Sequence, residues 1–121
     1  MRLEDEMNNA GLYAAAQVFI RQHLSSSWLN PELIAHQIGC SRAYLYRVFA
    51  GRGQTVAGFV RDLRLQCARE LLANKEASSA RVADIAYRCG FDDPVHFARL
   101  FRERYGLTPS ALRAEALGKP E

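Results

Sequence analysis

Apolar residues recur along this chain at spacings of three and four positions, which is the period of a helix with one buried face. The first such stretch ends near the serine run at 25–27, and its inward positions are Leu12, Ala16, Phe19, Ile20 and His23. The longest stretch covers residues 55–74, and the stripe along it comprises Val56, Phe59, Val60, Leu63, Cys67 and Leu71. The alternation typical of β-strands is absent, so the pattern predicts an all-α fold.

Capping residues mark where the helices begin. Three sites combine an N-cap side chain with proline at the first helical position, namely Asn30-Pro31, Asp93-Pro94 and Thr108-Pro109. The hydroxyls of Ser41 and Thr55 can cap two more helices, and we expect the neighbouring Asp92 to act as a cap like Asp93. Glycines at 39, 51, 53, 90 and 106 separate the helical stretches. These signals predict about seven helices.

One pattern within this helical chain occurs twice. The first copy comprises Ile34-Ala35, Gly39, Leu45, Arg47 and Phe49, and the second comprises Ile85-Ala86, Gly90, Phe97, Arg99 and Phe101. The offset between the copies is 51 positions before the turn and 52 after it, so one residue has been added inside the second turn. An internal repeat defines the structural unit. A helix, a glycine turn and a second helix indicate that this unit is a helix-turn-helix.

The repeat also predicts how the chain is organised. Residues 10–54 form a first helix-turn-helix subdomain, 55–74 a long linker helix and 75–114 a second subdomain, while 1–9 are a polar N-terminal segment and 115–121 a C-terminal tail. At 121 residues the chain suits one domain, or two small ones that share a helix, with no room for a large catalytic domain. The linker helix would be about 30 Å long. Successive major-groove faces on one side of a DNA duplex are roughly 34 Å apart, so this length suggests that both subdomains face one side of DNA.

In each repeat, the second helix has an inward face of apolar residues, and the remaining residues define its outward face. In the first repeat the inward residues are Leu45, Val48 and Phe49, and the outward ones are Arg42, Ala43, Tyr46 and Arg47. In the second repeat the inward residues are Phe97, Leu100 and Phe101, and the outward ones are Val95, His96, Ala98, Arg99 and Arg102. Arginine can donate two hydrogen bonds to a guanine edge, and a small alanine permits close approach to the groove. These nine outward residues are therefore the candidate DNA readers.

The distribution of charge supports this interpretation, because the excess of basic residues lies within the part of the chain that contains the repeats. Residues 40–113 hold 13 Lys and Arg against 7 Asp and Glu, whereas the two flanks together hold 3 against 6. Fourteen of the sixteen cations are arginine, whose planar fork suits phosphates and guanine edges. For exposed arginines outside these helices, such as Arg21, Arg69 and Arg81, an ordinary solvated role is the default. Arg64 and Arg88 are compatible with either a buried structural role or a phosphate contact.

Several other classes of protein are disfavoured. The three cysteines, Cys40, Cys67 and Cys89, form no C-x-x-C pair, and their odd number argues against a disulfide framework. We therefore expect a reducing cytoplasm, buried thiols and no zinc site. The start of the chain has no signal-peptide pattern and no apolar run is long enough to span a membrane. Catalytic motifs are absent, so we expect neither an enzyme nor a cofactor.

The stretch 34–113 resembles the DNA-binding domain of the AraC/XylS family of bacterial transcription regulators. The resemblance rests on residues 90–101, on Tyr105-Gly106-Leu107-Thr108-Pro109-Ser110 with Arg113, on Ser41, Tyr44-Leu45, Arg47 and Phe49, and on Arg64, Ala68 and Leu71-Leu72. It implies that the third and sixth helices enter adjacent major grooves and that the protein acts at promoters with RNA polymerase, most members being activators. It also implies base contacts from Ala43, Tyr46 and Arg47, and from Val95, His96, Ala98 and Arg99.

Two features depart from the family pattern. Many members carry a larger polar residue at the position of Ala43. We therefore expect DNA shape and phosphate contacts to matter more there, and direct base contacts less. Most also carry an effector-binding or dimerisation domain, for which this chain has no space. The alternative function is a helical protein-interaction module whose basic face binds an acidic partner. A third hypothesis is a thiol-based redox switch.

Overall fold

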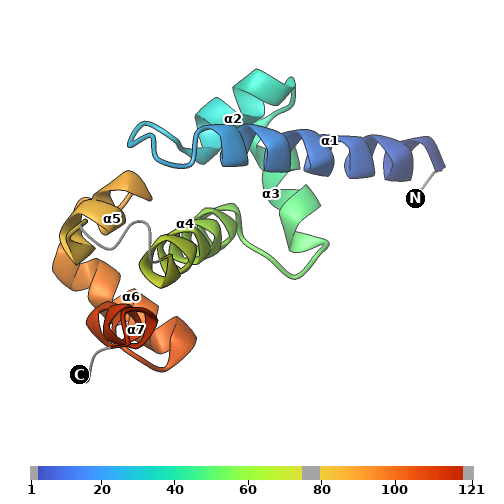
Figure 1. Cartoon of the computed structure of the whole chain (residues 1–121). Coiled ribbons are helices and arrows are strands. Elements are labelled where there is room, and N and C mark those ends of the chain that lie inside the picture. Colours follow the sequence, from blue (N-terminus) through green and yellow to red (C-terminus); the bar gives the residue numbers. More distant parts are fainter. Residues whose placement is uncertain (1–2, 75–79, 119–121) are drawn as a thin grey trace. The chain divides into compact units, whose positions relative to one another are not determined.

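The computed structural model describes residues 3–74 and 80–118, and across these ranges it contains seven helices and no strand. The helices are α1 (Leu3–Gln22), α2 (Pro31–Ile38), α3 (Arg42–Ala50), α4 (Val56–Ala73), α5 (Val82–Arg88), α6 (Pro94–Tyr105) and α7 (Pro109–Ala116), as Figure 1 shows. The predicted all-α class is therefore confirmed. Residues 1–2, 75–79 and 119–121 of the predicted N-terminal segment, second subdomain and tail lie outside the described ranges.

The chain divides into two compact units, 1–61 and 62–121, and the boundary falls inside α4. Each unit contains one helix-turn-helix, formed by α2 and α3 in the first and by α5 and α6 in the second. Helix α3 begins three positions after Gly39, and α6 begins four positions after Gly90. Both glycines have positive φ, 80° and 95°, which side chains with a Cβ rarely adopt. The extra residue of the second repeat thus lies between the turn glycine and the recognition helix.

The predicted N-caps are present. The accepting oxygens and donating amides are Asn30 Oδ1 with Leu33 N at 2.9 Å, Ser41 Oγ with Tyr44 N at 3.1 Å, Thr55 Oγ1 with Gly58 N at 3.0 Å, Asp93 Oδ1 with Val95 N at 3.0 Å, and Thr108 Oγ1 with Ala111 N at 3.1 Å. Each bond satisfies an amide that the first turn of a helix leaves without a partner. Local sequence therefore specifies where both recognition helices begin.

The first unit is built around the predicted inward residues. Ala16 and Ile20 of α1 are fully buried, as are Ile34 of α2 and Phe49 of α3. Tyr13, Phe49 and Phe59 form an aromatic cluster, with the ring centroids of Tyr13 and Phe49 5.1 Å apart and those of Phe49 and Phe59 5.3 Å apart. Helix α3 is short, so its stability comes mainly from this side-chain packing against α1 and less from its own backbone hydrogen bonds.

An arginine ties α1 to the turn that follows α3. The Arg52 guanidinium lies 4.0 Å from the centroid of the Tyr13 ring and donates hydrogen bonds to Asn9 Oδ1 at 2.7 Å and to the Val48 carbonyl at 3.1 Å. The Tyr13 hydroxyl donates to Gln54 Oε1 at 2.8 Å. The bonds from Arg52 to Asn9 and from Tyr13 to Gln54 join residues 43 and 41 positions apart, so they fix the end of the first helix-turn-helix to α1.

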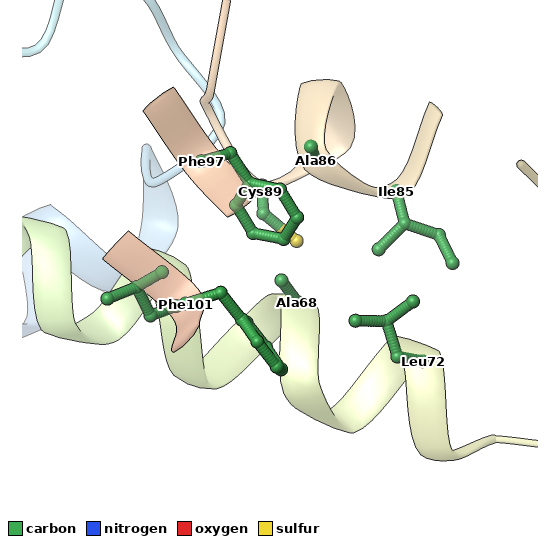
Figure 2. Packing of buried hydrophobic residues seen from close by; sticks show 8 residues of the cluster. Ala68, Leu72, Ile85, Ala86, Cys89, Phe97 and Phe101 are labelled. Carbon is green, nitrogen blue, oxygen red and sulfur yellow. The ribbon is translucent and has the colours of Figure 1, made fainter. Parts of the chain in front are cut away.

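The second unit has a core in which α4, α5 and α6 meet (Figure 2). Its buried members are Leu65, Ala68, Leu72, Ile85, Ala86, Cys89, Phe97 and Phe101. Figure 2 shows Phe97 and Phe101 of α6 together with Ala68 and Leu72 of α4 in this cluster. Helix α6 therefore owes its position to two phenylalanines on its inward face.

The prediction of one apolar stripe along α4 was wrong in the second half of the helix. The fully buried positions there are Leu65, Ala68 and Leu72, whereas Cys67 and Leu71 are only partly buried. In the first half Val56 and Val60 are buried as predicted. A helix that contributes to two separate cores does not have to present a single continuous stripe, so periodicity alone could not locate the second one.

Arg113 is a buried charged residue of α7, with 8% of its surface exposed. Its Nη2 donates to the Ala80 carbonyl at 2.9 Å, which links α7 to the residue two positions before α5 begins.

Within residues 3–74 and 80–118, no helix combines the length and apolar character needed to cross a bilayer.

Candidate DNA-recognition surfaces

Helix α3 presents a polar and basic face. Its inward residues Leu45, Val48 and Phe49 are buried, as predicted. Its exposed residues include all four that the pattern places outward, Arg42, Ala43, Tyr46 and Arg47. The Tyr46 side chain is 45% exposed, so its ring and hydroxyl both reach solvent. This face combines two cations and one aromatic hydroxyl, which can donate hydrogen bonds to base edges and phosphates, with one small residue that permits close approach.

Tyr44 supports Arg47 on this face. The Arg47 guanidinium lies 5.4 Å from the centroid of the Tyr44 ring, one helical turn earlier. Tyr44 itself is half-buried, so the ring is fixed at one edge while its face meets the cation. The spacing i, i+3 between an aromatic residue and an arginine is the sequence signal for this contact.

Helix α6 presents the corresponding face of the second unit. Phe97 and Phe101 are fully buried, and Leu100 is partly buried against the same core. Of the five predicted outward residues, Val95, His96, Arg99 and Arg102 are exposed, Val95 to 79%. Ala98 is half-buried instead. The reason is that Ala98 lines an open depression of about 540 Å³ whose other lining residues are Arg99, Arg102, Glu103 and Thr108.

A hydrogen bond connects two of the α6 candidates. Arg99 Nη2 lies 2.9 Å from His96 Nδ1. Because a guanidinium can only donate, His96 Nδ1 is the acceptor, and the proton of the neutral ring is then on Nε2. Asp93 Oδ1 also accepts from the backbone amide of His96 at 3.2 Å. The imidazole is thus held at its backbone by the cap and at its ring by the arginine.

Two residues near α6 have structural roles that the sequence left open. Asp93 caps α6, whereas the expectation that Asp92 also serves as a cap is wrong, because the N-cap hydrogen bonds of this helix are accepted by Asp93. Burial lowers the pKa of the half-buried Arg64, and the Asp92 carboxylate opposes that shift. An arginine with a somewhat lowered pKa still carries its charge at neutral pH. The charges of Arg64 on α4 and of Asp92 in the turn before α6 therefore attract each other.

Comparison with known proteins shows the family to which this chain belongs. Residues 34–115 match a family described as a helix-turn-helix domain. Over 111 residues the chain is 35% identical to the HTH-type transcriptional activator RhaS of Escherichia coli O1:K1, an alignment that covers 91% of this chain and 38% of RhaS. The chain therefore spans well under half the length of these curated relatives.

Solved structures agree with this match. An AraC-type transcriptional regulator from Chromobacterium violaceum superposes with a TM-score of 0.81 at 27% identity, covering 91% of this chain and 96% of that one. The C-terminal domain of AraT, a response regulator from Geobacillus stearothermophilus, has a TM-score of 0.73 at 27% identity, covering 86% and 84%. The fold and the match define a double helix-turn-helix DNA-binding domain. The chain belongs to the AraC family of bacterial transcriptional regulators, as the resemblance implied. This is a family of DNA-binding domains and not of enzymes.

Proposed function

We propose that this chain binds promoter DNA at a specific sequence by inserting α3 and α6 into adjacent major grooves, and that it activates transcription in the bacterial cytoplasm. The observation that carries the proposal is the repeated design of the two helices. Each begins directly after an N-cap residue and buries apolar anchors, three in α3 and two in α6. Each also exposes an arginine at the equivalent position, Arg47 or Arg99.

The exposed residues divide by chemistry. Arg47 and Arg99 are suited to a guanine edge, because the guanidinium donates two parallel hydrogen bonds to O6 and N7. Val95, Ala43 and Ala98 offer apolar contact to a thymine methyl group. Tyr46 and His96 each offer one donor, the hydroxyl and Nε2–H, for a base or a phosphate.

Arg42 and Arg102 complete the proposed interface. Both are exposed cations, Arg42 in the first turn of α3 and Arg102 in the last turn of α6. Arg42 lies five positions before Arg47 and Arg102 three positions after Arg99. We therefore assign both to the phosphates that flank the groove. Contacts of this kind position a protein on the duplex without reading its sequence.

Activation and its partners follow from the relatives. RhaS is an activator, and 38% of its length corresponds to this chain. We infer that RNA polymerase is the partner at the promoter and that effector binding or dimerisation belongs to a domain outside the aligned region. No small-molecule cofactor is required for the DNA contacts proposed here.

Selection from a randomised duplex library at near-physiological salt tests the proposal. We expect retained sequences to converge on two conserved blocks whose centres are about one helical turn apart, because each recognition helix reads one groove. An Arg47→Ala variant should lose one block and an Arg99→Ala variant the other. Retention without any consensus, together with equal competition by unrelated duplex, would contradict the proposal and favour a basic surface that binds an acidic protein.

A further inference from the structure

Two cysteine sulfurs meet in the core of the second unit. Cys67 lies on α4, and Cys89 is the residue that ends α5. Their Sγ atoms are 3.0 Å apart, although the residues are 22 positions apart in the chain. Figure 2 shows the Cys89 sulfur directed into the cluster that also contains Ala68 and Phe97. The DNA-binding role proposed above uses neither thiol.

The two thiols differ in exposure and acidity. Cys89 is buried, with 1% of its surface exposed, whereas Cys67 is half-buried and reaches solvent at one edge. The hydrogen bond from the Cys89 thiol lowers the pKa of Cys67 to about 7, against the opposing effects of burial and of Glu70. The same hydrogen bond and burial raise the pKa of Cys89. The hydrogen bond therefore favours the thiolate on the more accessible Cys67 and keeps the proton on the buried Cys89.

We propose that Cys67 and Cys89 are a dithiol site that hydrogen peroxide or another small hydroperoxide oxidises to an intramolecular disulfide. The Cys67 thiolate attacks a peroxide oxygen, the O–O bond breaks, and hydroxide leaves, which forms a sulfenic acid on Cys67. The Cys89 sulfur then attacks the Cys67 sulfur, the S–O bond breaks, and the departing hydroxyl takes the Cys89 proton as water. Overall one thiolate and one thiol lose two electrons, and one hydrogen peroxide becomes one hydroxide and one water.

The geometry suits this product. A disulfide bond is about 2.0 Å long, so the two sulfurs have to approach by about 1 Å. The bond would join α4 to the turn that leads into α6, closing a loop of roughly 20 residues. Cross-linking a loop of this size restricts the unfolded chain, so oxidation should raise the thermal stability of the second unit. Cys40 is the natural control, because it lies in the first unit and burial raises its pKa.

Peptide mapping of the full chain tests the site directly. Cleavage after lysine and arginine places Cys40, Cys67 and Cys89 in separate peptides, 22–42, 65–69 and 89–99. The reduced protein is treated with hydrogen peroxide, alkylated at acidic pH and digested without reductant. We expect peptide 65–69 to be joined to 89–99 in monomeric protein, the link to vanish with dithiothreitol, and Cys40 to remain alkylated. Alkylated Cys67 and Cys89 beside an oxidised Cys40, or a link only between chains, would overturn the proposal.

Substitutions separate the two steps. In Cys89→Ala the second step is blocked, so Cys67 should accumulate as a sulfenic acid that dimedone traps, and the pH at which its reaction accelerates should move upward from about 7. In Cys67→Ser, which leaves the buried residue intact, Cys89 should stay reduced. Cys40→Ser should behave as the parent. Circular dichroism confirms that each variant is folded, and a Cys67 that reacts no faster than Cys40 in the folded parent would contradict the proposal.

Discussion

Arg99 donates a hydrogen bond to His96, with Nη2 of the arginine 2.9 Å from Nδ1 of the imidazole one turn earlier on α6. Both side chains are exposed on the face assigned to DNA. A long arginine held by a neighbour loses less conformational freedom when it binds, because part of its rotamer entropy is already lost. The bond also leaves Nε2–H as the remaining donor of the His96 ring, so the pair offers donors from two side chains.

His96 should therefore act partly through Arg99. We expect His96→Ala to weaken specific binding by up to about 1 kcal/mol and Arg99→Ala by more, with a double variant whose loss differs from the sum by at least about 0.5 kcal/mol. A double-mutant cycle on an operator duplex measures this coupling. The control cycle pairs His96 with Arg47, which lies in the other unit, and should be additive. Additivity of His96 and Arg99 as well would rule out the supporting role.

Arg47 and Arg99 should carry base preference. Each alanine variant is expected to lose about 1 to 3 kcal/mol of specific binding, roughly 5- to 150-fold in Kd, and to relax the preference at one or two base pairs only. Arg47→Lys and Arg99→Lys keep the charge without the planar fork, so they should relax the same preference with a smaller loss of affinity. Arg21→Ala on α1 should change neither property. Base preferences that stay intact in both alanine variants would refute the assignment.

Salt dependence should distinguish phosphate contacts from base contacts. Each neutralised phosphate releases condensed counterions, so affinity falls steeply with salt concentration. Arg42→Ala and Arg102→Ala should each reduce the slope of log K against log salt by about 1 and weaken binding uniformly across sequences. Titrations by fluorescence anisotropy at several salt concentrations give the slope. A sequence-dependent loss would instead assign these two arginines to bases.

The cap of α6 should control the stability of the second unit. Asp93 accepts hydrogen bonds from the amides of Val95 and His96 at 3.0 and 3.2 Å. Asp93→Ala should lower the free energy of unfolding by about 1 kcal/mol, whereas Asp93→Asn keeps the cap and should stay within a few tenths of a kcal/mol of the parent. Urea denaturation followed by circular dichroism checks both. Equal destabilisation by the two variants would mean that the charge of Asp93, not its cap, is the stabilising element.

Arg52 should stabilise the first unit. It contacts the Tyr13 ring, Asn9 and the Val48 carbonyl, although the side chain as a whole is exposed. We expect Arg52→Ala to lower the free energy of unfolding by only about 1 kcal/mol, because solvent screens the contacts of an exposed side chain. Hydrogen exchange at the amides of α1 and α3 should become faster, because the contacts that hold these helices together are lost. Arg61→Ala, an exposed arginine of α4, is the control. Unchanged exchange in α1 would show that the aromatic cluster alone holds this helix.

Local chemistry explains why much of this protein could be predicted. Caps such as Ser41 and Asp93 act within three residues, and the burial of Leu45, Phe49, Phe97 and Phe101 follows from the helical period. The same period predicted the exposure of Arg42, Arg47, Arg99 and Arg102, and the structure has them exposed. Whether these side chains contact bases stays a prediction, because it depends on a partner that is not part of the fold.

Longer-range relationships could not be predicted in the same way. The buried face of the second half of α4, the interaction of Asp92 with Arg64 and the half-burial of Ala98 all depend on which segments meet in space. Periodicity along one helix contains no information about how many cores that helix serves. A carboxylate beside a helix start suits both a cap and an electrostatic interaction with a distant cation, and in this structure the cap hydrogen bonds of α6 are accepted by Asp93.

Hydrogen bonds and side-chain periods within a few residues set the helices, their starting residues and the repeat of two helix-turn-helix units, so all three could be predicted from the sequence. The contact between His96 and Arg99 is local as well, because the two residues are three positions apart on one helix. In contrast, Cys67 meets Cys89 and Arg52 lies over Tyr13 only once the helices have packed. These residues are far apart in the chain, and a different packing of the same helices would pair different side chains.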